Sequence, residues 1–225
     1  MVKSDVAQWS LFNKGRDLFT APGVEDYDRW MARKLQSLLK GKKTVVDYGA
    51  GDGLWSEYLA QNNPTRRFIA VEWNKDLYEY AITVRKPGLD NLEVIQADMS
   101  EPEGIFACDF FFCFGGLEHF SEHTKVLKAW VDRLSLDGKC IVTVPNLLNR
   151  EFLKNRCGIN PEDVLGEERV VTASYGYEEL WAPNHLAKVV MDSGLELMEL
   201  GILEALHYDR PLYFVGLKRV KEAPT

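Results

Sequence analysis

Short runs rich in β-branched and aromatic residues alternate along most of the chain with segments whose apolar residues recur three and four positions apart. The first pattern predicts buried strands and the second predicts amphipathic helices. Strands and helices that alternate in this way form a parallel sheet with right-handed crossover connections. The runs that predict the first five strands are residues 43–49, 66–73, 91–98, 108–116 and 139–145.

The helical segments lie before the first strand and between later strands. Ser121 predicts the N-cap of the helix after the fourth strand, and Gly138 predicts the end of that helix. The apolar positions that mark the four helices are Tyr27, Trp30, Met31, Leu35, Leu38 and Leu39; Leu54, Tyr58 and Leu59; Leu77, Tyr80, Ala81 and Val84; and Val126, Leu127, Trp130, Val131 and Leu134.

Two further strands are predicted near the end of the chain, at residues 195–203 and 210–218. Too few residues separate them for a crossover helix, which needs about a dozen residues, so we expect antiparallel neighbours. The predicted fold class is therefore α/β, a doubly wound seven-stranded mixed sheet with its last strand antiparallel and helices on both faces. We expect one domain over residues 1–225, with an N-terminal helical cap at residues 1–40 and an inserted segment at residues 147–182.

Composition narrows the class of protein. Hydrophobic residues make up 46% of the chain and charged residues 27%, as in ordinary globular proteins, and no apolar run is long enough to cross a membrane. The start of the chain lacks the pattern of a secretory signal, so we expect a cytoplasmic protein with reduced cysteines. The net charge of −7 argues against binding to nucleic acid, and the basic residues at 217–221 are interpreted as solvated charge.

The most informative stretch is "VVDYGAGDG", in which the first strand ends in a loop with three alternate glycines. Gly49, Gly51 and Gly53 permit positive φ angles and let a ligand approach the backbone. In an open α/β sheet, ligands bind at this carboxyl edge. The spacing D-x-G-x-G-x-G differs from the dinucleotide pattern G-x-G-x-x-G. Asp47 would oppose a pyrophosphate but suit a ligand that carries an ammonium or sulfonium charge.

Two more acidic residues end the next two strands. Glu72 is placed to accept hydrogen bonds from the hydroxyls of a ribose, and Trp73 offers a flat surface to a base. Asp98 could accept from an exocyclic amine while Met99 packs on the ring. Each acid alone is common at a strand end, but three successive ones indicate a nucleoside site.

With these residues the chain resembles the class I S-adenosylmethionine-dependent methyltransferases. "VVDYGAGDG" looks like their first motif, Glu72 and Asp98 like their second and third, and "CDFFFCFGGLEHF" like their fourth. Within that class it is most similar to the small-molecule branch that includes ubiquinone and menaquinone biosynthesis enzymes. The good motifs cover residues 40–146, and a weaker pattern covers residues 177–218.

The resemblance implies that S-adenosyl-L-methionine is the cofactor and that its methyl group passes by in-line displacement to an O, N or C atom of a small molecule. It also implies that residues 147–182 cover the substrate. No nucleic-acid or membrane partner is expected, and the oligomeric state stays open. The residues implied in cofactor binding are Asp47, Gly49, Ala50, Gly51, Gly53, Glu72, Trp73, Asp98, Met99, Phe114 and Gly115.

The histidines leave alternatives open. His119, directly after Glu118, is the best-placed general base, and a brace for the adjoining helix is its other interpretation. His119 and His123 are four positions apart, yet no third ligand lies at a recognised metal spacing, so no metal is expected. His185 is expected to cap a helix or face solvent. His207 and Tyr208 lie in the turn between the last two predicted strands; contact with a substrate, as in some members of the family, is the less favoured interpretation for them.

Two rival functions use the same sheet. One is an NAD-dependent oxidoreductase, which the glycine spacing disfavours. The other is a catalytically silent cofactor-binding protein, against which the intact acidic and glycine positions argue. A change in nicotinamide absorbance with candidate substrates would identify the first rival.

Overall fold

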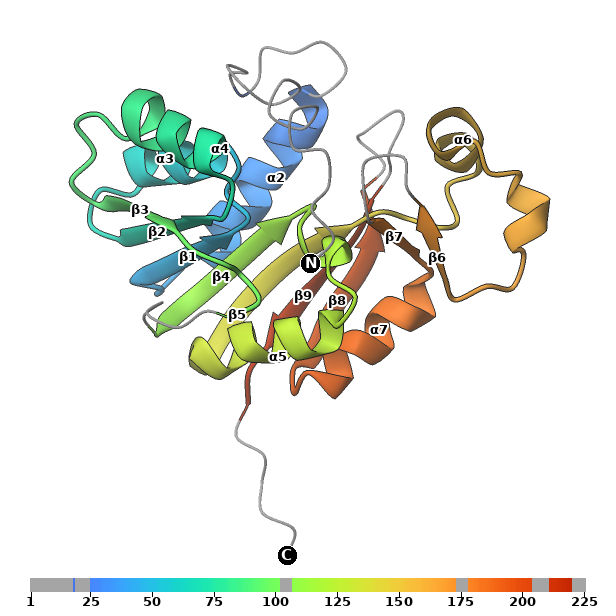
Figure 1. Ribbon diagram of the computed structural model, residues 1–225. Coiled ribbons are helices and arrows are strands. Elements are labelled where there is room, and N and C mark those ends of the chain that lie inside the picture. Colours follow the sequence, from blue (N-terminus) through green and yellow to red (C-terminus); the bar gives the residue numbers. More distant parts are fainter. Residues whose placement is uncertain (1–17, 19–24, 102–106, 173–177, 204–210, 220–225) are drawn as a thin grey trace, which may run out of the picture.

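The computed structural model describes residue 18 and residues 25–101, 107–172, 178–203 and 211–219. A seven-stranded sheet runs through the middle of the molecule, in the order β3-β2-β1-β4-β5-β9-β8 (Figure 1). The first five strands are parallel, and β9 is antiparallel to both β5 and β8. The predicted mixed sheet is thus confirmed. The strands are β1 (Thr44–Tyr48), β2 (Arg67–Glu72), β3 (Leu92–Gln96), β4 (Cys108–Phe114), β5 (Leu134–Val144), β8 (Glu196–Ile202) and β9 (Leu212–Leu217).

Helices cover both faces of the sheet (Figure 1). One face carries α2 (Glu25–Leu38), α3 (Leu54–Asn62) and α4 (Lys75–Tyr80), and the other carries α5 (His123–Arg133) and α7 (Pro183–Asp192). Each face has its own cluster of buried apolar side chains because the strands are apolar on both sides. No helix in the described part of the chain is long and apolar enough to cross a membrane.

The helix after β2 buries a residue that the apolar pattern did not predict. This helix, α4, continues directly into one π-helical turn, η1 (Ala81–Arg85), and a π-helix has more residues per turn than an α-helix. The inward position is therefore displaced by one residue, and Val84 is 50% exposed while Arg85 is buried. The prediction that Val84 faces the core is wrong.

Both predicted ends of the helix after β4 are also wrong. Helix α5 begins at His123, and its N-cap Glu122 makes no side-chain cap hydrogen bond, so Ser121 is not the cap. The helix ends at Arg133, and β5 follows at once. Gly138 lies inside β5, where an added Cβ would come within 2.6 Å of the Leu134 Cγ atom. Close packing in the strand, rather than helix termination, explains this glycine.

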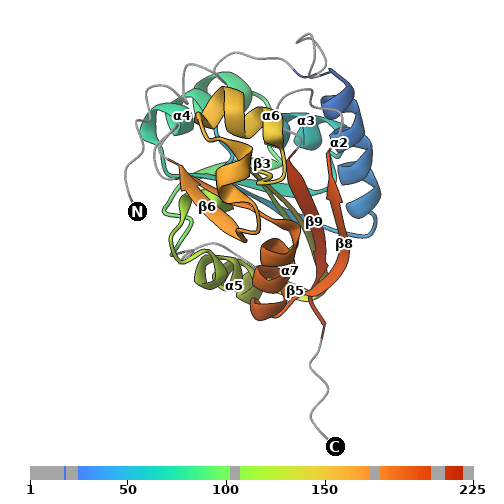
Figure 2. The ribbon, with the colours of Figure 1, turned by 90° about the vertical axis from the view of Figure 1, so that its right-hand side faces the viewer.

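The segment predicted as an insertion, residues 147–182, contains helices and strands that were not predicted, because its apolar runs are short and lie between polar residues. A two-stranded antiparallel hairpin and three short helical turns project beyond one end of the sheet (Figure 1), and in Figure 2 they face the viewer in front of the sheet. They enclose a small core of Leu147, Phe152, Leu153, Leu180 and Ala182. The elements are α6 (Arg150–Phe152), η3 (Leu153–Cys157), η4 (Pro161–Val164), β6 (Arg169–Thr172) and β7 (Glu178–Trp181).

Candidate functional site

The glycine loop follows β1 and leads into α3, as the sequence predicts. Gly49, Gly51 and Gly53 have φ angles of 76°, 58° and 80°, in the left-handed region that favours glycine. The N–H groups of Gly49 and Ala50 donate to the Val71 carbonyl at 2.9 and 3.0 Å, which ties the loop to β2. A Cβ added to Gly51 would meet no described atom within 4 Å. The backbone at Gly51 therefore borders open space that a ligand can enter.

Asp47 is buried in β1, directly below this loop. The Ser56 hydroxyl donates to its Oδ2 atom at 2.7 Å. Burial raises the pKa of Asp47 from 3.8 to about 8; the Ser56 bond lowers it, and the nearby Glu72 and Asp52 carboxylates raise it further. Burial and the neighbouring acids thus disfavour ionisation of Asp47, and a positive charge placed at this edge of the sheet would lower its pKa.

Glu72 ends β2 and is also buried. Its Oε2 atom accepts from the Gly51 N–H at 2.8 Å, and its Oε1 atom accepts from the Asn74 N–H at 2.7 Å. Burial raises its pKa from 4.5 to about 7, although both backbone bonds oppose that change. Each carboxylate oxygen keeps a further lone pair. Glu72 therefore fixes the glycine loop and can still accept a hydroxyl donor, and the first of these roles was not predicted.

Asp98 and Met99, the two residues predicted to contact the adenine, follow β3, and one is exposed while the other is buried. Asp98 is exposed, and its Oδ1 atom accepts from the Ser100 N–H and hydroxyl at 2.8 and 2.7 Å. Met99 is buried, with its sulfur 3.2 Å from where a Gly49 Cβ would lie. Its carbonyl accepts from the Trp130 indole N–H at 2.7 Å. Trp73 is half-buried. The structure thus brings Met99 against the loop and leaves Asp98 accessible beside it.

The end of β4 forms the adjoining wall. Phe114 ends the strand, Gly115 has a φ of 73°, and the short helix η2 (Leu117–His119) follows. Glu118 is buried, and among the described residues its Oε2 atom has no hydrogen-bond partner. Burial raises the pKa of Glu118 from 4.5 to about 8. His119 is half-buried at the end of η2.

A buried ion pair that the sequence analysis did not predict connects the glycine loop to the end of the helix after β2. Arg85 Nη2 lies 3.1 Å from Asp52 Oδ2, and Arg85 Nη1 lies 3.2 Å from Glu57 Oε2. The Asp52 Oδ1 atom accepts from the Leu54 N–H at 3.2 Å and so orders the start of α3. The sequence shows acidic residues near Gly53 and a basic residue, Arg85, after the next helix. It does not show that they are in contact, because this contact depends on the π-helical turn.

Glu118 leads to a pH prediction. In the unfolded chain its pKa is near 4.5, whereas the folded chain keeps the proton up to about pH 8. Its contribution to stability is therefore complete below about pH 4.5 and is lost as the pH rises through about 8. Glu118→Gln removes this dependence. Between about pH 4.5 and 8, the free energy of unfolding of Glu118→Gln should therefore fall with pH less steeply than that of the wild type, by up to about 1.4 kcal/mol per pH unit.

Denaturant unfolding at a series of pH values measures this slope. The exposed Glu122→Gln variant is the matched control and should retain the wild-type slope. An unchanged slope in Glu118→Gln would show that Glu118 is not buried as a neutral acid.

Comparisons with known proteins agree with the geometry. A family model described as "Methyltransferase domain" matches residues 24–195. A search of curated proteins found no match.

Solved structures share the fold. An S-adenosylmethionine-dependent methyltransferase from Aquifex aeolicus has a TM-score of 0.66 at 17% identity, covering 95% of this chain and 98% of that one. A Mesorhizobium loti methyltransferase that depends on the same cofactor has a TM-score of 0.67 at 11% identity, covering 89% and 100%. The Burkholderia thailandensis 1,6-didemethyltoxoflavin-N1-methyltransferase, solved with 1,6-didemethyltoxoflavin and S-adenosylhomocysteine, has a TM-score of 0.66 at 16% identity, covering 85% and 78%.

These identities are low, so the structural likeness establishes the fold, which is the predicted Rossmann-like one. The family model spans well over half of the sequence and establishes the class of enzyme. The chain therefore belongs to the methyltransferase domain family, as its motifs predict.

Proposed function

We propose that this methyltransferase transfers the methyl group of S-adenosyl-L-methionine to a small-molecule acceptor. The observation that carries the proposal is the pair of buried carboxyl groups, Asp47 and Glu72, on either side of the open glycine backbone at Gly51. Their raised pKa values mean that a positive charge nearby is favourable, because it offsets the cost of ionising them. A sulfonium nucleoside with an ammonium group supplies that charge, and a nicotinamide dinucleotide supplies a pyrophosphate instead.

The residues present fit the parts of this cofactor. Asp47 and the loop from Gly49 through Ala50 to Gly53 would hold the methionine part, and the free lone pairs of Glu72 would accept from the ribose. The exposed Asp98 carboxylate would accept from the adenine amine, with Met99 and Trp73 against the ring. Phe114 and Gly115 would border the methyl group.

When bound, the cofactor supplies an electrophilic methyl carbon and a good leaving group, so the protein need only orient the reactants and exclude water. The glycine loop and its carboxyl groups fix the donor for in-line displacement. The described parts of the segment at residues 147–182 lie beyond one end of the sheet (Figure 1). We propose that this segment and the N-terminal cap at residues 1–40 cover the acceptor. For an acceptor that must lose a proton, His119 is the candidate general base.

Two likenesses support a proposal for the class of acceptor. The sequence resembles the branch that includes ubiquinone and menaquinone biosynthesis enzymes, whose products contain a planar quinone ring, and one structural neighbour was solved with bound 1,6-didemethyltoxoflavin. Both kinds of compound are planar, and Phe114 with the nearby Trp55 ring, 5.9 Å away, provides aromatic surface next to the proposed methyl site. We therefore propose a planar small-molecule acceptor.

Transfer of isotope-labelled methyl groups tests this function. The purified chain is incubated with labelled S-adenosylmethionine and the small-molecule fraction of a cell extract, and products are separated and identified by mass. We expect label in a small molecule, and His119→Gln should lower kcat while leaving cofactor affinity unchanged. Label found only in protein or nucleic acid would contradict the acceptor class. Reduction of NAD in place of methyl transfer would favour the oxidoreductase.

A further inference from the structure

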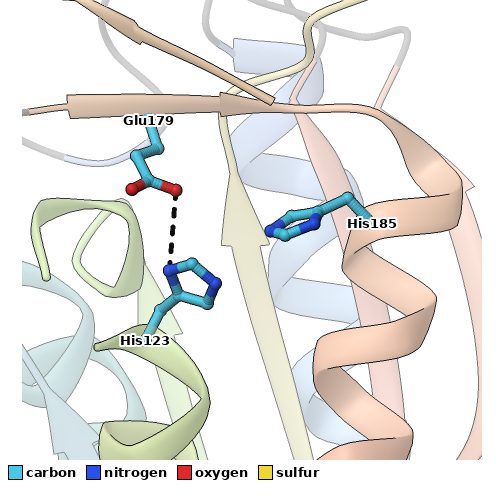
Figure 3. Close-up of side chains that lie close together, drawn as sticks. All are labelled: His123, Glu179 and His185. Atoms are coloured by element: carbon cyan, nitrogen blue, oxygen red, sulfur yellow. Dashed lines mark ion pairs between the residues drawn. The ribbon is translucent and has the colours of Figure 1, made fainter. Parts of the chain in front are cut away.

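A buried cluster of two histidines and a glutamate lies outside the proposed cofactor site. His123 begins α5, Glu179 lies in β7, and His185 lies in the first turns of α7. Figure 3 shows the three side chains pointing toward one another from these separate elements. The cluster thus joins the inserted hairpin to the two helices on one face of the sheet.

The spacing of the ligand atoms suits one metal ion. One nitrogen of each imidazole and one Glu179 oxygen all lie within 4.8 Å of one another, and His123 Nδ1 is 3.5 Å from Glu179 Oε2. Two ligand atoms of a tetrahedral zinc ion, with bonds of about 2.0 Å, are about 3.3 Å apart. The His123–Glu179 pair therefore needs almost no movement, and the His185 nitrogen, within 4.8 Å of both other ligand atoms, would have to move closer to them.

The two imidazole nitrogens also lack other partners. Within the described part of the chain, His123 Nδ1 and His185 Nε2 are buried and accept or donate no hydrogen bond. Leaving a buried polar atom unsatisfied costs about 1–3 kcal/mol. The Trp181 ring packs against both imidazoles, at 4.6 and 5.1 Å between centroids, and holds them in place.

Arg169 is the competing partner of the carboxylate. Its Nη1 atom lies 3.2 and 3.3 Å from the two Glu179 oxygens, but its side chain is 50% exposed and Glu179 is fully buried. Because half of the Arg169 side chain is exposed, it can turn outward when a metal ion takes its place on the Glu179 oxygens.

We propose that His123, Glu179 and His185 bind one divalent transition-metal ion of the zinc class. Imidazole nitrogens favour zinc, cobalt or copper, whereas magnesium and calcium prefer all-oxygen sites. The ion would connect α5, α7 and β7 and so fix the inserted segment against the core. The sequence predicts no metal site, since His119 and His123 have no third ligand at a recognised spacing. The two other ligands proposed here, Glu179 and His185, come from a distant segment of the chain, so spacing could not reveal them.

Metal titration of the whole chain tests the site. Protein treated with a chelator and dialysed is titrated with Zn²⁺ alone by calorimetry and with Co²⁺ alone by visible absorption. We expect one ion per chain, d–d bands typical of four-coordinate cobalt, and a higher Tm with zinc. His185→Gln, whose folding is checked by circular dichroism, should weaken binding about 100-fold, as should Glu179→Gln.

Two controls distinguish this site from adventitious binding. His119→Gln removes a histidine near His123 in sequence and should bind the metal as the wild type does. Arg169→Gln frees Glu179 from its cation and should bind equally or more tightly. Absence of stoichiometric uptake in the wild type would overturn the proposal, and so would uptake that His185→Gln and Glu179→Gln leave unchanged. The readout does not depend on methyl transfer, so its failure is separate from that of the proposed function.

Discussion

Replacing Arg85 by alanine should lower the free energy of unfolding by about 3–5 kcal/mol, because it leaves a buried carboxylate without its counter-ion. The Arg85 and Asp52 side chains are only 7% and 5% exposed, and their atoms lie 3.1 Å apart. Asp52 stands between Gly51 and Gly53, so the loop should also be disordered and bind cofactor less tightly. Chemical denaturation measures the first effect and calorimetric titration the second.

Two further variants test the reason for this loss. Lys128→Ala removes an exposed ion pair with Asp132 and should cost at most about 0.5 kcal/mol. The double change Arg85→Met with Asp52→Asn removes both charges of the Arg85–Asp52 pair and keeps a capping oxygen at position 52, and should recover much of the stability. A loss below about 1 kcal/mol in Arg85→Ala would mean that solvent reaches Asp52 and that the pair is not buried.

Glu72→Ala should weaken S-adenosylmethionine binding by about 1 to 3 kcal/mol, which is about a 5- to 150-fold rise in Kd. The variant removes the proposed acceptor of the ribose hydroxyls and also releases the Gly51 N–H, to which Glu72 is bonded at 2.8 Å. Both losses act on the same ligand, one directly and one through the shape of the loop. Calorimetric titration of the folded variant measures Kd.

Glu72→Gln separates the two contributions, since its amide keeps one oxygen acceptor but loses the other, and an intermediate Kd is expected. Glu93→Ala is the control on the neighbouring strand β3. Its side chain is 43% exposed and pairs with Arg67, so the variant should bind cofactor as the wild type does. Undiminished binding by Glu72→Ala would show that the ribose lies elsewhere.

Much of the fold follows from the sequence because strands buried on both faces leave continuous apolar runs and helices leave a three-and-four pattern. The close spacing of the last two strands correctly indicated their antiparallel pairing. The glycine loop followed in the same way, since three alternate glycines after a buried strand have few other physical uses. Their left-handed φ angles confirm the predicted turn.

Features that depend on long-range contact could not be predicted. A single π-helical turn moved the buried position from Val84 to Arg85, and no periodic pattern reveals such a turn beforehand. His185 was expected to cap a helix or face solvent, yet it lies against His123 across the fold. Glu179 joins them from a hairpin whose short strands carry polar residues. Assignments that rest on residues 1–17, 19–24, 173–177 and 204–210, including much of the predicted N-terminal cap and His207, lie outside the described residues.

The most direct test of the account is a calorimetric titration of the wild-type chain with S-adenosylhomocysteine and, separately, with NAD. The demethylated product keeps the ribose, adenine and ammonium groups that Glu72, Asp98 and Asp47 are proposed to hold. We expect one molecule of S-adenosylhomocysteine to bind per chain and NAD not to bind. Binding of NAD, or no heat with S-adenosylhomocysteine, would contradict the proposal that the glycine loop and its buried acids hold the nucleoside and amino-acid parts of S-adenosylmethionine.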